Sequence, residues 1–292
     1  METMKEPSME DVKMEPTWKS LFKKMLRNKS SLIGGAIIAF FMMVAILSPL
    51  LQMHDPTEVN LMERFQTPSA THWFGTDESG RDIFSRIIAG THLTLYVGLA
   101  AVAIGAFIGT VLGLFAGFYG RVADSIIMRT CDVLLAFPGI LLSLAIISAL
   151  GPSLNNIIIA LSIYNIPVFI RMVRGSVLEV KNMEFIDAIR VVGAKDSKII
   201  FKHILGNVTS PIIVTITLRI ANSILLASGL SFLGLGAQPP TPEWGAMLNA
   251  GQNYMLNYPH LTIFPGLMIV LVILGFNLLG DGLRDILDPK SK

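Results

Sequence analysis

The sequence predicts an all-α integral membrane protein with six transmembrane helices and with its N and C termini in the cytoplasm. Of its 292 residues, 52% are hydrophobic and only 15% are charged, whereas about a quarter of the residues of a soluble domain are charged. The hydrophobic residues also form long runs, each able to cross about 30 Å of hydrocarbon. Helices are expected because lipid offers no hydrogen-bond partners to the backbone.

The first 30 residues contain no such run. Between Thr17 and Arg27, apolar residues recur at helical spacing, with basic residues between them. This pattern favours a helix that lies in the membrane interface. We therefore expect a cytoplasmic tail with an interfacial helix over 1–30. The first transmembrane helix, over 31–51, should be retained because no convincing cleavage site follows its apolar run, Leu32–Leu51.

Five more apolar runs follow. Residues 52–91 are rich in turn-forming residues and predict an extracytoplasmic loop. A membrane core over 92–281 then contains a polar cytoplasmic loop at 174–210, and residues 282–292 form a cytoplasmic tail. The spans in this core are expected at Leu93–Phe118, Ile126–Leu150, Asn155–Val173, Pro211–Gly236 and Leu261–Gly280.

The distribution of Lys and Arg predicts the orientation. Segments on one side hold most of these residues, whereas the segments on the other side hold only Arg64, Arg81 and Arg86. Short cytoplasmic loops carry the excess of Lys and Arg. Both termini and the polar loop should therefore face the cytoplasm. The net charge of +2 is small and gives no reason to expect binding to nucleic acid.

Glycines and prolines mark particular positions in the spans. The second span carries Gly98, Gly105, Gly109, Gly113 and Gly117, and the last four recur at intervals of four, which places them in a stripe on one helix face. The stripe allows close helix packing, either inside this chain or against a partner. Pro138 and Pro167 predict kinks in the third and fourth spans. Arg129 and Asp132 lie three residues apart and can pair on one face.

The sequence lacks the motifs of several kinds of chemistry. It has no phosphate-binding loop and no H-E-x-x-H motif, its five histidines are scattered, and it has a single cysteine, Cys131. We therefore expect no catalytic residue, no metal site and no cofactor in this chain. Arg219 is a poor candidate for ion coupling on its own, and no pair of acids lies deep in a span, as a secondary carrier would require.

The polar segment Val180–Pro211 is not explained by the membrane spans. Phe185, Ile186 and Ile189 recur at the spacing of one face of a short helix, and small residues follow at Gly193 and Ala194. A short amphipathic helix of this kind can insert into a groove of another protein.

This loop resembles the "EAA" loop of permeases in ATP-binding-cassette (ABC) importers. Asp187 takes the place of the Glu, Ala188 is retained, Ile189 replaces the second Ala, Gly193 is retained, and Gly206 stands where the family usually has Pro. Longer stretches are similar to the C-type permease of dipeptide, oligopeptide and nickel importers. They are GTDESGRDIFSR, MRTCDVLLAFP, LSFLGLGAQPPTPEWGAML and FNLLGDGLRDILDPK.

The resemblance implies the fold of an ABC type I importer permease and a set of partners. A homologous B-type permease would complete the pathway, two ABC ATPase subunits would bind ATP and Mg²⁺, and an extracytoplasmic solute-binding protein would deliver the substrate. The residues expected to couple to an ATPase are Glu184, Phe185, Asp187, Ala188, Ile189, Gly193 and Ala194. Asn222, Ser223 and Ser228 are expected to line the pathway, and Asp77, Asp82, Glu243 and Trp244 to contact the binding protein.

Three hypotheses about function remain open at this point. The first is a permease of a di- or oligopeptide importer in a bacterial or archaeal cytoplasmic membrane. The second is a nickel or metal-chelate importer of the same architecture, because Leu226, Ala227, Ser228 and Gly229 stand where many peptide-type relatives have an acidic residue. The third, from a different class, is a self-contained secondary carrier.

Overall fold

The structure is a computed structural model that describes residues 18–287. The sequence-predicted tail residues 1–17 and 288–292 lie outside the described part. Within residues 18–287 every regular element is helical, apart from one isolated bridge between Thr76 and Asp82. The long helices are α2 (Lys29–Leu51), α3 (Ile83–Tyr119), α6 (Leu154–Val180), α9 (Leu205–Phe232) and α11 (His260–Leu287).

Shorter helices lie between the long ones. They are α1 (Trp18–Arg27), η2 (Leu61–Glu63), α4 (Arg121–Leu135), α5 (Gly139–Leu150), α7 (Glu184–Val191), α8 (Asp196–Lys198), the π-helical turn η3 (Ile199–Ile204), α10 (Trp244–Gly251) and η4 (Gln252–Tyr254). Five helical segments among the described residues are long and apolar enough to cross a membrane. The bent pair of α4 and α5 supplies a sixth when it is counted as one span.

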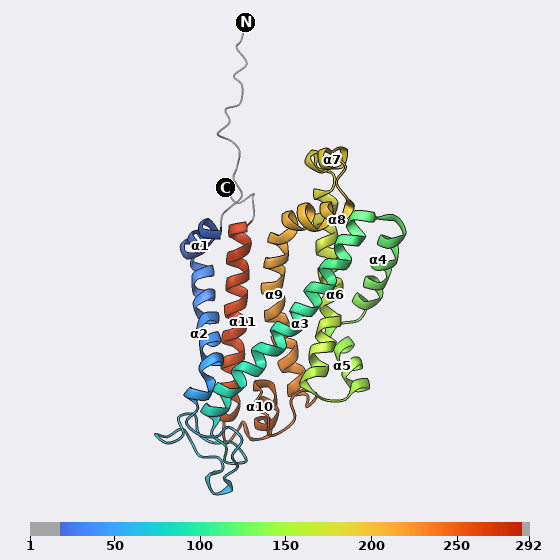
Figure 1. The fold of residues 1–292 in the computed structure, drawn as a ribbon. Helices are drawn as coiled ribbons and strands as arrows, with labels where there is room; N and C mark the ends of the chain where they lie inside the picture. Colours follow the sequence, from blue (N-terminus) through green and yellow to red (C-terminus); the bar gives the residue numbers. More distant parts are fainter. Residues whose placement is uncertain (1–17, 288–292) are drawn as a thin grey trace.

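The sequence places each end of α2, α6, α9 and α11 within seven residues of its observed position, but α3 begins ten residues before the predicted start. It starts at Ile83, inside the predicted outer loop, because the Asp82 side chain accepts a hydrogen bond from the Ser85 backbone N–H and caps the helix. Its 37 residues span about 55 Å at 1.5 Å per residue. This length exceeds the hydrocarbon thickness, and α3 crosses the other helices obliquely (Figure 1).

Pro138 breaks its span rather than kinking it. Helix α4 ends at Leu135, α5 begins at Gly139, and the two helix axes meet at 89°. Proline has no backbone N–H, and it disfavours the helical conformation of the residue before it. Pro167, by contrast, lies buried inside an unbroken α6.

The glycine stripe of α3 packs inside this chain. An added Cβ at Gly109 would lie 2.5 Å from Phe169 Cβ, and one at Gly113 would lie 2.8 Å from Val173 Cβ. Gly105 and Gly117 meet the same helix, α6, in the same way, whereas Gly98 meets Ile224 of α9. The sequence left open whether the stripe packs inside this chain or against a partner, and the structure shows that it packs inside this chain. Helices α3 and α6 approach each other closely from Gly105 to Gly117.

The helices form one bundle with two distinct ends (Figure 1). Helix α7 lies at one end, together with the start of α2 and the end of α11, whereas α10 and the segment 52–82 lie at the other end. The start of the first span and the end of the last therefore share a side, as the sequence predicted. A buried cluster that includes Val177, Ile186, Ile199, Ile200 and Ile204 lies beneath α7.

Candidate functional site

Helix α7 is held on the bundle by one face and exposes the other. Ile186 is completely buried in the cluster beneath the helix, and Ile189 packs partly against the same cluster. Val191 and Val192 are 88% and 87% exposed, and Phe185 is also exposed. The outward face of α7 is thus apolar over its last turn, although it has no partner among the described residues.

Gly193 ends α7 in a Schellman motif. Its φ of +82° lies in the left-handed region. The Gly193 N–H donates to the Arg190 carbonyl at 2.9 Å, and the Ala194 N–H donates to the Ile189 carbonyl at 3.3 Å. An added Cβ at Gly193 would meet nothing within 4 Å among residues 18–287. The need for glycine here is therefore conformational rather than steric.

Helix α6, which leads into α7, is joined to α4 by two ion pairs, and the lysine at its end is joined to α3 by a hydrogen bond. The Arg174 guanidinium donates to both carboxylate oxygens of Asp124, with Nη2 2.7 Å from Oδ2. Asp132 pairs with Arg171 rather than with Arg129, because α6 lies against α4. Beside α7, Lys181 Nζ donates to the Gly117 carbonyl at 2.7 Å.

The middle of α9 carries polar residues. Ser223 is buried, and its hydroxyl accepts a hydrogen bond from Asn165 Nδ2 of α6 at 3.0 Å. Ser228 is buried too, and its hydroxyl has no hydrogen-bond partner in the part of the chain that the structure describes. Asn222, by contrast, is exposed on the surface of this chain. Of the three polar residues that we expected to line a pathway, only Asn222 faces outward.

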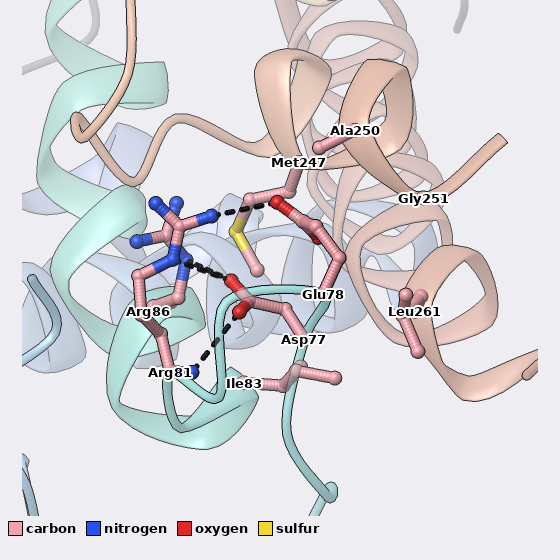
Figure 2. A pocket seen from close by; sticks show the side chains of 9 residues that line it. All are labelled: Asp77, Glu78, Arg81, Ile83, Arg86, Met247, Ala250, Gly251 and Leu261. Atoms are coloured by element: carbon pink, nitrogen blue, oxygen red, sulfur yellow. Dashed lines mark hydrogen bonds and ion pairs between the residues drawn. The ribbon is translucent and has the colours of Figure 1, made fainter. Parts of the chain in front are cut away.

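At the opposite end of the bundle, buried charges connect the loop 52–82 to α3. Arg81 Nε donates to Asp77 Oδ2 at 2.7 Å, and Arg81 Nη2 donates to Glu78 Oε1 at 2.8 Å (Figure 2). Arg86 Nη1 donates to the backbone carbonyls of Pro56 and Pro240 at 2.7 and 3.2 Å. This arginine therefore joins two loops that lie far apart in the sequence.

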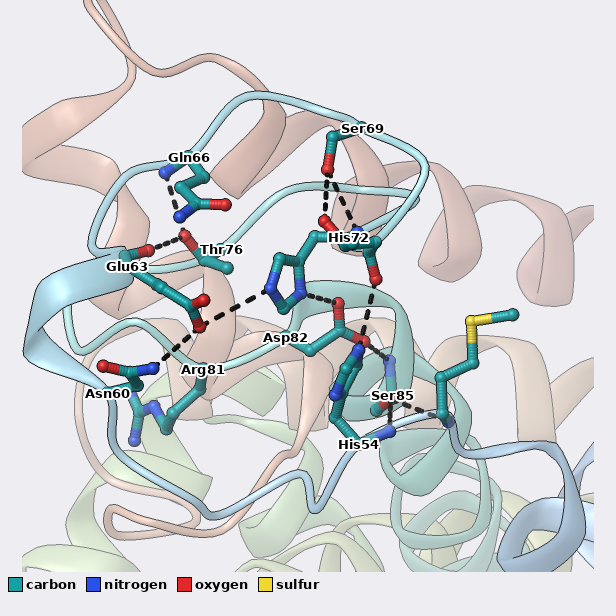
Figure 3. Close-up of polar contacts among 12 residues, drawn as sticks. His54, Asn60, Glu63, Gln66, Ser69, His72, Thr76, Arg81, Asp82 and Ser85 are labelled. Carbon is teal, nitrogen blue, oxygen red and sulfur yellow. Dashed lines mark hydrogen bonds and ion pairs between the residues drawn. The ribbon is translucent and has the colours of Figure 1, made fainter.

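The His72 side chain lies inside the same loop, between two acidic residues (Figure 3). Its Nδ1 is 2.9 Å from Asp82 Oδ1 in a hydrogen bond, and its Nε2 is 3.7 Å from Glu63 Oε2. One potential ligand atom from each of His54, His72 and Asp82 lies within 4.8 Å of the others. This spacing is wider than a bound ion requires, and each of the three side chains already takes part in a hydrogen bond.

Glu243 begins α10 as a buried cap. Its carboxylate accepts hydrogen bonds from the backbone N–H groups of Gly245 and Ala246 at 3.0 and 2.9 Å. Burial raises the pKa of the Glu243 carboxyl above its ordinary value, and these hydrogen bonds only partly oppose that shift. The indole N–H of Trp244 donates to the Ile87 carbonyl at 3.0 Å, so α10 is anchored directly on α3.

Comparisons with known proteins agree with this architecture. The family model of the binding-protein-dependent transport system inner membrane component matches residues 109–292, well over half of the chain. The chain belongs to this family. A second model, the N-terminal transmembrane domain of oligopeptide transport permease C, matches residues 17–68.

Two relatives of this permease cover nearly its whole length. The dipeptide transport system permease protein of Alkalihalophilus pseudofirmus is 50% identical over 94% of this chain and 90% of its own. The glutathione transport system permease protein of Pectobacterium atrosepticum is 46% identical over 98% of this chain and 95% of its own. Both are transport permeases, so the present chain is a multi-pass transport subunit.

A solved structure has the same fold. It is a chain of the MetNI methionine ABC transporter in an inward-facing conformation, and it matches with a TM-score of 0.56 at 20% sequence identity. The match covers 70% of this chain and 97% of that chain. The predicted fold of an ABC importer permease is thus confirmed.

Among the residues expected to couple this permease to an ATPase, the structure separates two roles. The exposed residues of α7 include Glu184, Phe185, Asp187 and Ala188. Ile189, on the inner face of the same helix, is half-buried. Gly193 and Ala194 form the end of the helix rather than its outward surface. Val191 and Val192 were not among the predicted residues, although two adjacent valines at the end of a short polar helix are a visible signal in the sequence.

The four residues expected to contact a binding protein are corrected by the structure. Asp77, Asp82, Glu243 and Trp244 are all buried, and Trp244 has no exposed surface. Each of the four has its polar group bonded inside this chain. These side chains therefore hold the outer segments of the permease together and are not available to another protein.

Proposed function

We propose that this chain is the permease subunit of an ATP-driven, binding-protein-dependent importer of di- and oligopeptides. A homologous permease would complete its translocation pathway, two ATPase subunits would bind ATP and Mg²⁺ and drive it, and an extracytoplasmic binding protein would deliver the peptide. The bilayer would be the cytoplasmic membrane of a bacterium or an archaeon, with α7 on the cytoplasmic side, where Lys and Arg are concentrated.

The observation that carries this proposal is the half-docked helix α7. A helix whose inner face is fixed by Ile186 and whose outer face exposes Val191 and Val192 can transmit a push from a bound protein into α6 and α9. The helix is short and capped at its end, so it can move as a rigid body with the two spans it connects. An amphipathic helix seated in a groove is a recurring mode of recognition between proteins.

The substrate class rests on the names of the relatives. Dipeptide and glutathione are both short peptides, and relatives named for their transport are 46–50% identical to this chain. These names favour the peptide importer over the nickel or metal-chelate importer of the same architecture. A self-contained secondary carrier is disfavoured by the exposed docking surface of α7.

The decisive experiment is peptide uptake by proteoliposomes that contain the chain, its sister permease, both ATPases and the binding protein. We expect uptake of a labelled dipeptide that requires ATP and every subunit. Val191→Asp should abolish stable binding of the ATPases, because it places a charge in the apolar contact. Lys195→Asp, an exposed change of charge just beyond α7, is the matched control and should have a smaller effect. Uptake by the purified chain alone would contradict the proposal.

A further inference from the structure

Arg219 lies well inside a membrane-spanning helix. It precedes the end of α9 by 13 residues, or about 20 Å at 1.5 Å per residue, and it follows the start of the continuous span Asp196–Phe232 by 23 residues. A charged side chain at this depth is costly, and such residues face a protein interior or a water-filled cavity. The position therefore requires something that stabilises its charge.

No acidic residue within residues 18–287 provides that stabilisation. Two arginines of α6, Arg171 and Arg174, are each paired with an aspartate of α4. Arg219 instead has its guanidinium carbon 5.1 Å from the centre of the Tyr164 ring, and its buried Nε has no hydrogen-bond partner among the described residues. The ring orients the guanidinium and leaves its charge without a counterion.

Tyr164 connects Arg219 to the break in the third span. An added Cβ at Gly139, the first residue of α5, would lie 2.5 Å from the Tyr164 ring. The non-helical backbone just before Gly139 belongs to the 89° bend between α4 and α5. Irregular backbone at membrane depth is tolerated where it is covered by protein or lines an aqueous cavity. The charged side chain and the broken helix thus meet at one place.

Asn222 is a second polar residue on α9 beside Arg219. It follows Arg219 by three residues, so both lie on the same face of the helix, and Asn222 is exposed. An exposed amide beside an unneutralised guanidinium is unsuited to lipid. This part of α9 therefore has the composition of an aqueous pathway wall.

We propose that Arg219, held by Tyr164, binds the carboxylate of a peptide as the peptide crosses the membrane. This inference rests on the proposed function, because it assigns a contact to the peptide in that pathway. A planar guanidinium donates two parallel hydrogen bonds to a carboxylate, and every unmodified peptide carries a carboxylate at its C-terminus. The bound carboxylate supplies the counterion that residues 18–287 do not provide, and the exposed Asn222 amide adds a donor beside it.

The first test measures the charge of the pathway beside Arg219 without using a substrate. The background is Cys131→Ala, which removes the single, buried cysteine, and Asn222→Cys provides a reporter in the assembled complex. A sulfonate-bearing methanethiosulfonate reagent should modify this cysteine faster than a trimethylammonium-bearing one. Adding Arg219→Gln should lower the ratio of the two rates about tenfold, from the field of one charge at this range.

A buried neighbour provides the control for this test. Ser223→Cys places the reporter on the side of α9 that bonds to Asn165, so both reagents should react slowly there. The proposal would be overturned if neither reagent reached Asn222→Cys in any nucleotide state. A ratio that Arg219→Gln leaves unchanged would overturn it equally.

The second test follows the peptide itself in proteoliposomes of the complete complex. Uptake of a dipeptide is compared with uptake of its C-terminal amide, after both have been shown to bind the solute-binding protein. Arg219→Gln should reduce the rate ratio of acid to amide about tenfold, the effect of losing a charge-assisted pair. Arg219→Lys keeps the positive charge but lacks the planar guanidinium, so it should retain part of the preference for the peptide acid over its amide. Arg171→Gln, which removes an ion-paired arginine, should slow both peptides alike.

The outcomes separate this inference from the proposed function. If the wild-type complex imports no peptide in an ATP-dependent way, the proposed function fails. If it imports both peptides but Arg219→Gln slows them equally, only the carboxylate contact fails. Should Arg219→Gln not reach the membrane, the acid-to-amide ratio of Arg219→Lys still decides, because a purely structural role of Arg219 predicts no change in that ratio.

Discussion

Asn165 and Ser223 join two helices across the centre of the bundle. The Asn165 amide donates to the Ser223 hydroxyl at 3.0 Å and to the Leu161 carbonyl at 2.9 Å. The Cβ of Asn165 also lies against Gly105, so a single side chain contacts α3, α6 and α9. These three helices therefore meet at one polar point inside an apolar core.

We expect Asn165→Leu to destabilise the protein more than Ser223→Ala does. Ser223→Ala removes one interhelical hydrogen bond and should cost about 0.6–1 kcal/mol. Asn165→Leu removes both bonds and adds a branched side chain where Gly105 leaves little room. The thermal midpoint of the purified complex in detergent measures both effects, and equal midpoints would contradict the central role of Asn165.

Gly109→Ala should separate α3 from α6. The new methyl group would lie 2.5 Å from Phe169 Cβ and 2.8 Å from the Ile166 carbonyl oxygen, and such overpacking costs about 1–3 kcal/mol. The matched control is Gly175→Ala in α6, where an added Cβ meets nothing within 4 Å. The thermal midpoint should fall for Gly109→Ala only. Equal midpoints for the two variants would mean that α3 and α6 are not tightly packed.

Gly193 should tolerate asparagine better than valine. At a φ of +82°, a β-branched residue is strained by about 1–2 kcal/mol or more, whereas asparagine adopts this region more readily. Gly193→Val should therefore unwind the end of α7 and reduce ATP-driven uptake, while Gly193→Asn keeps most of it. If both variants lost uptake equally, the presence of any side chain at position 193, rather than the backbone conformation there, would explain the loss.

The buried Glu243 predicts a pH dependence of stability. Because burial raises its pKa in the folded chain, the folded state holds this proton at pH values where the unfolded state has lost it. The resulting contribution is greatest below the ordinary pKa of 4.5, and it is lost as the pH rises through the raised value.

Glu243→Gln isolates this effect, because glutamine does not titrate. The thermal midpoint of the wild type minus that of the variant should decrease as the pH is raised from about 4. A difference that stays constant or grows over this range would show that the pKa of the Glu243 carboxyl is not raised in the folded chain.

The sequence predicted the spans well because a segment that crosses a membrane must be composed almost entirely of apolar residues. Runs such as Leu32–Leu51 and Leu261–Gly280 are apolar on every side, and only a helix satisfies their backbone groups in lipid. The glycine stripe likewise predicted one close helix contact. Its partner could not be deduced, because a small face fits any neighbouring helix, and only the folded chain shows that α6 fills it.

The outer residues show where such reasoning fails. Asp77, Asp82 and Glu243 lie in segments rich in turn residues, and acidic side chains there are usually exposed. The structure instead buries each beside an arginine, a histidine or a set of backbone N–H groups. These partners come from positions that pattern analysis does not connect, such as the contact of Arg86 with Pro56 and Pro240.

The seam between α3 and α6 has a mechanical consequence. Helix α6 leads directly into α7, and α3 carries at its far end the contacts of Arg86 and Trp244 with the outer segments. Because the two helices touch backbone to backbone along the glycines, they cannot slide past each other without collisions. We therefore expect a torque applied to α7 to move α6 and α3 together, and with them the outer segments that contact Arg86 and Trp244.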